Sequence, residues 1–395
     1  MRSLRFTLAL ILALLAASWS VQAQSVQLWT QDATQPWLLE AIDAFTAETG
    51  IEVEVKAISF GTEELFTAFA GDSPPDLFTH GLAALGAFAA LGVLEPLESI
   101  YTKWEFAADI VPQGLAAGQY QGRQVALPLG GVVVRDLVYR SDLFELAGIG
   151  ADQPPRNWSD LVEYGRKLTE RRPDGTLARS GLAVDTGDQM FSMLLRHLGR
   201  DLIEDGRSTL ASAEAVEALS FQTDLIHVYG VHELGFNANL PAGTAAMTWT
   251  DMRYWSLDDP VVDFLKVATF PYEKEPATFL GTRIVMMPSG AKNKDEAIRL
   301  LEFLLHPRTQ YRLTMLSGSI PFFGQAREWE WVQDSPVLVH FMAALSYAYP
   351  NPAHELWFDI RTIIQEAIAS AMRQERPPRN ALEDAHARVQ ALLEN

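Results

Sequence analysis

The stretch VQLWTQDATQPWLLEAIDAFTAETGIEVEVKAI, residues 26–58, decides the fold class. It opens with a short apolar strand pattern, and a helix pattern follows in which Trp37, Ala41 and Phe45 recur at fourfold spacing and a glycine ends the helix. Residues 51–58 then alternate apolar and charged side chains, which is typical of a half-buried strand. Strand, helix and strand in this order predict an α/β unit with parallel strands.

The same alternation continues along the chain. A second helix begins at Thr62, and residues 77–80 indicate a short buried strand. Further strands are predicted at 124–128 and 132–139, and further helices at 158–169, 213–229, 294–305 and 355–373. The order predicts an α/β protein with a largely parallel sheet.

The N-terminal residues predict export. Arg2 and Arg5 precede the apolar run 8–17, and Val21-Gln-Ala23 fits a cleavage site. The run is too short to cross a bilayer, so we interpret residues 1–23 as a secretory signal peptide. No Cys follows it, and we therefore expect a periplasmic protein without a lipid anchor.

Composition excludes several classes of function. The chain has 395 residues, no Cys and a net charge of −19, with 31 Lys and Arg against 50 Asp and Glu. Disulfides and thiolate metal sites are excluded, and nucleic acid or anionic lipid would be repelled by most of the surface. We expect no nucleic-acid partner, no membrane insertion of the mature protein, and a monomer.

Catalytic motifs are incomplete. Residues 232–236 (HELGF) and 354–358 (HELWF) begin like a zinc-protease helix, but Phe stands where the second His is required. There is no phosphate-binding glycine loop, and no Ser lies in a G-x-S-x-G motif. We therefore expect no enzyme, no cofactor and no metal site, with a secreted polysaccharide-active enzyme as a remaining alternative.

Segments in sequence order over nearly the whole mature chain resemble the extracellular solute-binding proteins of carbohydrate-type ABC transporters. They are AGDSPPD (70–76) with FAALGVLEPL (88–97), YQGRQVALP (120–128) with LVYRSDLF (137–144), PRNW (155–158) with KLT (167–169), AGTAAM (242–247) with Trp249, and Gly281 with SGAKNKDEA (289–297) and FLL (303–305). Two places depart from the family pattern. Tyr139-Arg140 replaces Tyr-Asn, and Thr248–Asp251 replaces Gly-Ser-Trp, both close to the expected cleft.

The resemblance implies a periplasmic-binding-protein-like fold: two α/β lobes with a ligand cleft between them and several hinge crossings. We expect the crossings near 130–134, 270–280 and 317–321. Lobe one would comprise residues 24–131 and 275–318, and lobe two residues 132–274 and 319–395. The implied function is to bind a sugar by hinge closure and deliver it to the permease subunits of an ABC importer. A phosphorylated polyol, an organic acid or another small polar solute is the alternative ligand.

We expect the ligand to be held by loops that follow strands, where aromatic faces and polar side chains stand together. The candidate ligand-binding residues are Trp29, Gln31, Asp32, His80, Gln189, Trp249, Asp251, Trp255, Gly281 and Arg283.

Several candidates also have a purely structural interpretation. Trp29 could fill the core of lobe one, and Asp32 could cap the helix that follows it. His80 at the end of a buried strand is more often a core histidine. Trp249 and Asp251 are the favoured contacts, because we place them in a polar loop, and Trp249→Ala is expected to weaken binding without lowering the melting temperature.

Overall fold

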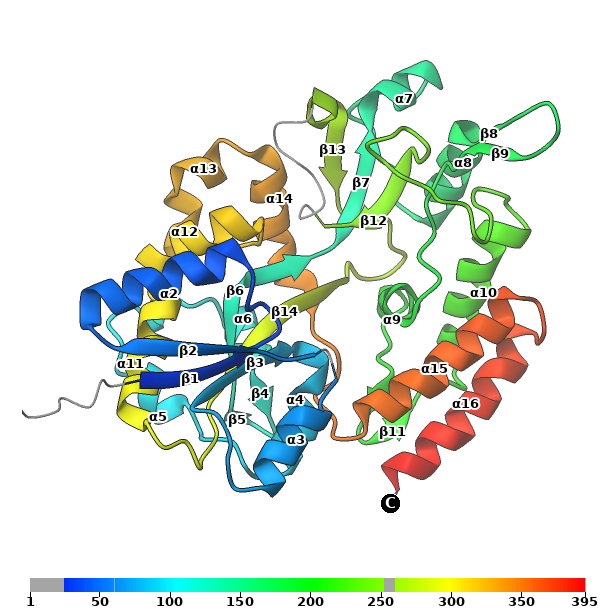
Figure 1. Cartoon of the computed structure of the whole chain (residues 1–395). Helices are drawn as coiled ribbons and strands as arrows, with labels where there is room; N and C mark the ends of the chain where they lie inside the picture. Colours follow the sequence, from blue (N-terminus) through cyan, green and yellow to red (C-terminus); the bar gives the residue numbers. More distant parts are fainter. Residues whose placement is uncertain (1–24, 60, 252–259, 395) are drawn as a thin grey trace, which may run out of the picture.

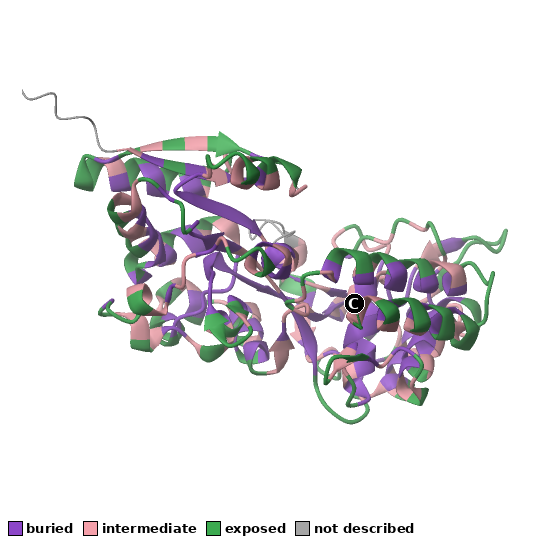
Figure 2. Cartoon of the chain, turned by 90° about the horizontal axis from the view of Figure 1, so that it is seen from below, coloured by how far each residue is buried: buried purple, intermediate pink, exposed green. Residues whose placement is uncertain are grey.

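The computed structural model describes residues 25–59, 61–251 and 260–394. The predicted signal peptide and Trp255 lie outside these residues. The chain is an α/β protein whose buried residues fill the interiors of two bodies that lie side by side (Figure 1, Figure 2). Each body corresponds to one cluster of buried apolar side chains, the first built around a large sheet and the second mainly around helices.

The larger sheet has six strands: β1 (Ser25–Thr30), β2 (Glu52–Ala57), β3 (Leu77–Gly81), β6 (Leu127–Val134), β14 (Thr278–Met286) and β15 (Ala348–Tyr349). Strand β1 pairs in parallel with β2 and β3, as the alternation of strands and helices over residues 26–80 predicted, and β14 pairs in parallel with β15. Strand β14, however, is antiparallel to both β3 and β6. The prediction of a largely parallel sheet was therefore wrong for its centre. Parallel neighbours would need a crossover connection, usually a helix, to join them. Strands β6 and β14 instead run between the two bodies.

Helices cover this sheet on both faces. They are α2 (Pro36–Thr49), α3 (Glu63–Ala70), α4 (Leu85–Ala90), α5 (Glu98–Tyr101), α6 (Pro112–Ala116), α11 (Lys294–Leu305), α12 (Pro307–Ser317), α13 (Glu330–Gln333) and α14 (Pro336–Ala344), with 3-10 turns η1 (Leu82–Ala84), η2 (Ala107–Asp109), η5 (Gly324–Glu328) and η6 (Leu345–Tyr347). Helix α2 has Pro36 in its first turn and ends at Gly50 with φ 72°, a left-handed conformation that favours glycine. Ala41 and Phe45 face the core, as their spacing predicted, whereas Trp37 is half-buried.

The second body contains a three-stranded antiparallel sheet and most of the remaining helices. Its sheet has the order β12 (Met247–Thr250), β7 (Asp136–Arg140) and β13 (Leu265–Ala268). Its helices are α7 (Ser141–Leu146), α8 (Trp158–Leu168), α9 (Asp188–His197), α10 (Ala213–His227), α15 (Trp357–Met372) and α16 (Pro378–Leu393), with η4 (Pro260–Phe264) beside the sheet. Two-stranded hairpins are β8 (Glu170–Arg171) with β9 (Leu177–Arg179), β10 (Ile203–Glu204) with β11 (Arg207–Ser208) and, in the first body, β4 (Gln119–Tyr120) with β5 (Arg123–Gln124).

Three crossings join the two bodies in the described residues, and Leu240, Ala245 and Leu265 of the second body also pack in the first cluster. Strand β6 becomes β7 with only Arg135 between them, and β14 leaves the second cluster at Phe279 and enters the first at Leu280. The third passage runs from Leu345 to Trp357, because residues on both sides of 317–321 pack in the first cluster. This packing favours extending lobe one to about residue 349. The division into lobes at fixed residue numbers stays a proposal.

Candidate functional site

A hollow of about 360 Å³ lies where the first two crossings meet. The loop after β1, the start of α2, strands β6 and β14 and the end of α12 form its walls. The polar side chains that line it are Asp32, Gln35, Arg135, Thr282, Arg283, Ser317 and Ser319, and the aromatic ones are Trp37 and Phe279.

Two glycines shape the wall formed by β6. Gly130 and Gly131 have φ values of 76° and 85°, in the left-handed region that favours glycine. A Cβ atom on Gly131 would lie 2.8 Å from the Ile320 carbonyl oxygen, too close for any side chain. The pairing of β6 with β14 shifts register here, between Thr282 and Arg283. At this bulge Gly130 and Gly131 are left out of the pairing with β14, beside the hollow.

Asp32 and Arg283 meet in the hollow. Arg283 Nε donates to Asp32 Oδ2 at 2.8 Å, and Nη2 lies 3.5 Å from Oδ1. The residue that precedes α2 is Gln35, which makes no capping bond, so Asp32 does not cap this helix. Gly281 lines the same hollow. The structure therefore brings together three of the predicted residues, Asp32, Gly281 and Arg283. The two members of the ion pair are 251 positions apart in the chain.

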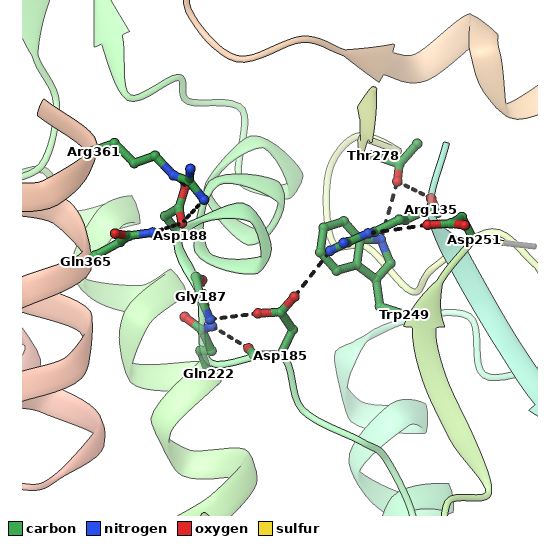
Figure 3. Close-up of polar contacts among 10 residues, drawn as sticks. All are labelled: Arg135, Asp185, Gly187, Asp188, Gln222, Trp249, Asp251, Thr278, Arg361 and Gln365. Carbon is green, nitrogen blue, oxygen red and sulfur yellow. Dashed lines mark hydrogen bonds and ion pairs between the residues drawn. The ribbon is translucent and has the colours of Figure 1, made fainter. Parts of the chain in front are cut away.

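Arg135 is the main polar residue that the sequence interpretation missed. Its Nη1 lies 3.3 Å from Asp185 Oδ2 and its Nε 3.9 Å from Asp251 Oδ2, and its guanidinium carbon lies 5.0 Å from the centre of the Trp249 ring (Figure 3). The Arg135 carbonyl oxygen accepts a hydrogen bond from the Thr278 hydroxyl at the second crossing. A single cation inside the run VVVRDLVY was the available signal.

Trp249 and Asp251 lie behind Arg135 rather than in an open loop. Trp249 is in β12, paired with Leu137 of β7, and only 4% of its surface is exposed. Its Nε1 donates to Thr278 Oγ1 at 3.3 Å, and the ring packs in the second cluster. Asp251 is 1% exposed. The expectation that Trp249 lies in a polar loop was wrong. Residues 247–250 form a strand in which buried and half-buried residues alternate.

Gln31, His80 and Trp29 lie near the hollow but do not line it. Gln31 Nε2 is 3.2 Å from His80 Nε2 and donates to the Ser59 carbonyl oxygen at 3.1 Å. His80 is buried with its ring against Phe88, as the core interpretation proposed. Trp29 is half-buried beneath Lys56, whose ammonium lies 3.6 Å from the ring centre. Their contact with ligand remains a prediction.

The start of α9 forms a second polar group opposite Arg135 (Figure 3). The Asp188 carboxylate accepts hydrogen bonds from two side chains of α15, Arg361 Nε at 2.9 Å and Gln365 Nε2 at 2.7 Å. Gln222 from α10 donates to the Asp185 carbonyl oxygen at 2.8 Å. Gln189 is half-buried in the first turn of α9, so its role as a ligand residue stays a prediction, as does that of Trp255.

Within the described segments no helix is long and apolar enough to cross a bilayer. In those same segments no three His, Asp or Glu side chains gather as ligands of a metal ion would.

Comparison with known proteins places the chain in one family. The profile of the bacterial extracellular solute-binding proteins matches residues 30–311. A binding protein of Brucella abortus is 26% identical over 97% of this chain and 96% of its own, and the maltotriose-binding protein of Pyrococcus abyssi is 22% identical over 81% and 68%.

A solved structure has the same fold. The ABC transporter solute-binding protein of Thermotoga lettingae, bound with alpha-D-tagatose, superposes with a TM-score of 0.81, at 24% identity over 94% of this chain and all of that one. The likeness confirms the predicted periplasmic-binding-protein-like fold. This chain belongs to the bacterial extracellular solute-binding protein family.

Proposed function

We propose that the protein is the sugar-binding component of an ABC importer and that the hollow between the two bodies holds the sugar. The observation that carries this proposal is the pairing of charges around the hollow. Arg283 is paired with Asp32, and Arg135 with Asp185 and Asp251. The site therefore offers hydrogen-bond donors and acceptors together without an excess of positive charge.

Such a set suits an uncharged ligand with many hydroxyl groups. A hydroxyl group both donates and accepts, so it can bridge a guanidinium and its carboxylate partner. Trp37 adds an aromatic face, onto which the apolar face of a sugar ring can pack. A phosphorylated polyol or organic acid fits less well, because an anion would have to displace the carboxylates from the two arginines.

The relatives support the same ligand class. Proteins that bind maltotriose and tagatose share the family or the fold. We propose that the two bodies close around the sugar by hinge motion, as periplasmic binding proteins do as a class. We further propose that residues 1–23 direct the chain to the periplasm, that it acts there without catalysis, and that permease subunits receive the sugar.

A thermal-shift screen tests the ligand class. Mono- and disaccharides, organic acids and sugar phosphates are added to the mature chain, and hits are measured by calorimetric titration. A sugar that binds will raise the melting temperature by mass action. Stabilisation by sugar phosphates or acids alone would reject the sugar proposal. Turnover of a chromogenic glycoside would reject the absence of catalysis.

A further inference from the structure

We propose that the sugar is an oligosaccharide whose chain leaves the hollow and continues along a track on the outer face of α2 and α12. This inference rests on the proposed function and extends it to the length of the ligand. The structure favours such a track because three depressions on this side of the first body adjoin one another at shared lining residues.

The three depressions share residues in series. Trp37 lines the hollow and also a second depression of about 210 Å³ between α2 and α12. Arg308 lines this second depression and also a third, of about 570 Å³, bounded by η2, the start of α12 and η5. The three depressions therefore stand in a row, with Trp37 at the junction of the first two and Arg308 at the junction of the second and third.

Helix α12 forms one wall of the track over its whole length. Its C-terminal Ser317 lines the hollow, and Pro307 at its other end lines the third depression. Eleven residues of helix span about 16 Å. Helix α2 lies alongside α12 (Figure 1) and supplies the opposite wall of the middle depression through Glu40, Ala44 and Glu48.

Aromatic rings stand at both ends of the track. Trp37 is half-buried at the hollow, and Phe106, Tyr311 and Trp329 are half-buried in the third depression. The Tyr311 and Trp329 rings are 5.1 Å apart in an edge-to-face arrangement. Rings that keep an exposed face while their other side packs on the core are suited to receive the apolar face of a sugar ring.

The charged residues between these rings are paired. Arg312 Nε lies 2.6 Å from Glu40 Oε1, and Arg308 Nη2 lies 3.5 Å from Glu48 Oε2. The Arg312 hydrogen bond lowers the pKa of Glu40, which keeps the carboxylate ionised as an acceptor. The middle of the track thus repeats the paired donors and acceptors of the hollow, and it suits hydroxyl groups rather than an anion.

A protein partner fits this surface less well than a sugar chain. The buried centre of a protein interface is depleted in charged residues, whereas the middle of the track holds two ion pairs.

Calorimetric titration of the mature chain with oligosaccharides of increasing length tests the inference. The probes are the series from maltose to maltoheptaose, from mannobiose to mannohexaose and from cellobiose to cellohexaose. In the series that binds, we expect the affinity to rise by about tenfold or more beyond the disaccharide. Ala44→Trp, which fills the middle depression from an exposed position, should abolish this gain and leave disaccharide affinity unchanged.

The matched control is Ala47→Trp on the same helix, at an exposed position outside the three depressions, which should keep the gain. Trp329→Ala should lose the part of the gain that comes from the longest probes, and Trp329→Phe should restore much of it.

The outcomes separate the two proposals. If disaccharides bind but longer chains gain nothing, the track is refuted and the sugar-binding proposal stands. If no sugar of any length binds, the proposed function itself is refuted. If Ala44→Trp keeps every affinity but impairs uptake by a reconstituted transporter, the surface is a protein-docking face and the track is refuted.

Discussion

The Tyr347 hydroxyl donates a 2.7 Å hydrogen bond to the Asp136 carboxylate, across 211 positions of the chain. Asp136 is completely buried in β7, and it also contacts His340 Nε2 at 2.8 Å and the backbone N–H groups of Leu137 and Phe270. The contacts of Asp136 with His340 and Tyr347 hold the first crossing against α14 and η6, next to Arg135 at the hollow.

We expect Tyr347→Phe to lower the free energy of unfolding by about 1.5–3 kcal/mol, because it removes one donor from a buried carboxylate and keeps the ring. Burial and the charge of Asp136 raise the pKa of Tyr347, so its hydroxyl stays protonated as a donor. Urea denaturation measures the change. Tyr120→Phe, at a hydroxyl whose contact with Gln121 is exposed, is the control and should be nearly neutral. Equal effects at the two positions would contradict a special role for Asp136.

Arg135→Gln should weaken sugar affinity by about tenfold or more, which corresponds to about 1.4 kcal/mol. It removes the cation that links the hollow to Asp185 and Asp251. Calorimetric titration measures the affinity, with Arg156→Gln in an exposed ion pair as the control. Unchanged affinity in Arg135→Gln would remove this residue from the binding site.

Asp32→Asn and Arg283→Gln should not act independently. Their side chains share an ion pair in the hollow, so the double variant should lose less sugar affinity than the two single losses combined. We expect a coupling energy of about 1 kcal/mol from the four titrations. Strict additivity would show that the pair does not hold the ligand as a unit.

Trp249→Ala should lower the free energy of unfolding by about 3–5 kcal/mol, because it opens a cavity in the second cluster. This replaces the expectation from sequence that the melting temperature would be unchanged. Trp249→Phe leaves a smaller cavity and should cost less. Thermal denaturation of both variants measures the loss of stability. An unchanged melting temperature for Trp249→Ala would show that the ring does not support the core.

Stability should fall as the pH decreases from about 6.5 to about 4, partly because of His197. Burial lowers the pKa of His197 to about 4, while its Nε2 contacts the Ala277 carbonyl oxygen at 2.9 Å. In this range the unfolded chain binds a proton that the folded chain does not, which favours unfolding by about 3 kcal/mol at the acid end. His197→Gln should show a shallower decrease in urea denaturation. Parallel curves for the two proteins would contradict the assignment.

Local patterns were enough to predict many elements. Helices α8, α10, α11 and α15 begin and end within two residues of the predicted ranges, because each has an apolar stripe and a clear stop. The direction of β14 could not be predicted in the same way. Its partners β3 and β6 are distant in sequence, and no local pattern states whether a returning strand runs parallel or antiparallel.

The site was predictable where a polar residue follows a strand or interrupts an apolar crossing. Asp32 and Arg283 satisfied that rule, and so did Arg135, although its position between β6 and β7 was not used. Trp249 failed because a short strand with threonines at alternate positions resembles a polar loop. The ion pairs themselves depend on contacts between residues far apart in the chain, which a single sequence does not reveal.

The position of β14 also constrains the order of events during synthesis. A ribosome makes β1, β2 and β3 early, but β3 has no neighbour on its other side until residues 278–286 have emerged. The nascent N-terminal half therefore lacks the centre of its own sheet for most of translation. The first body therefore cannot complete its sheet until the chain has been made as far as β14, by which point all three strands of the second body's sheet have already been made.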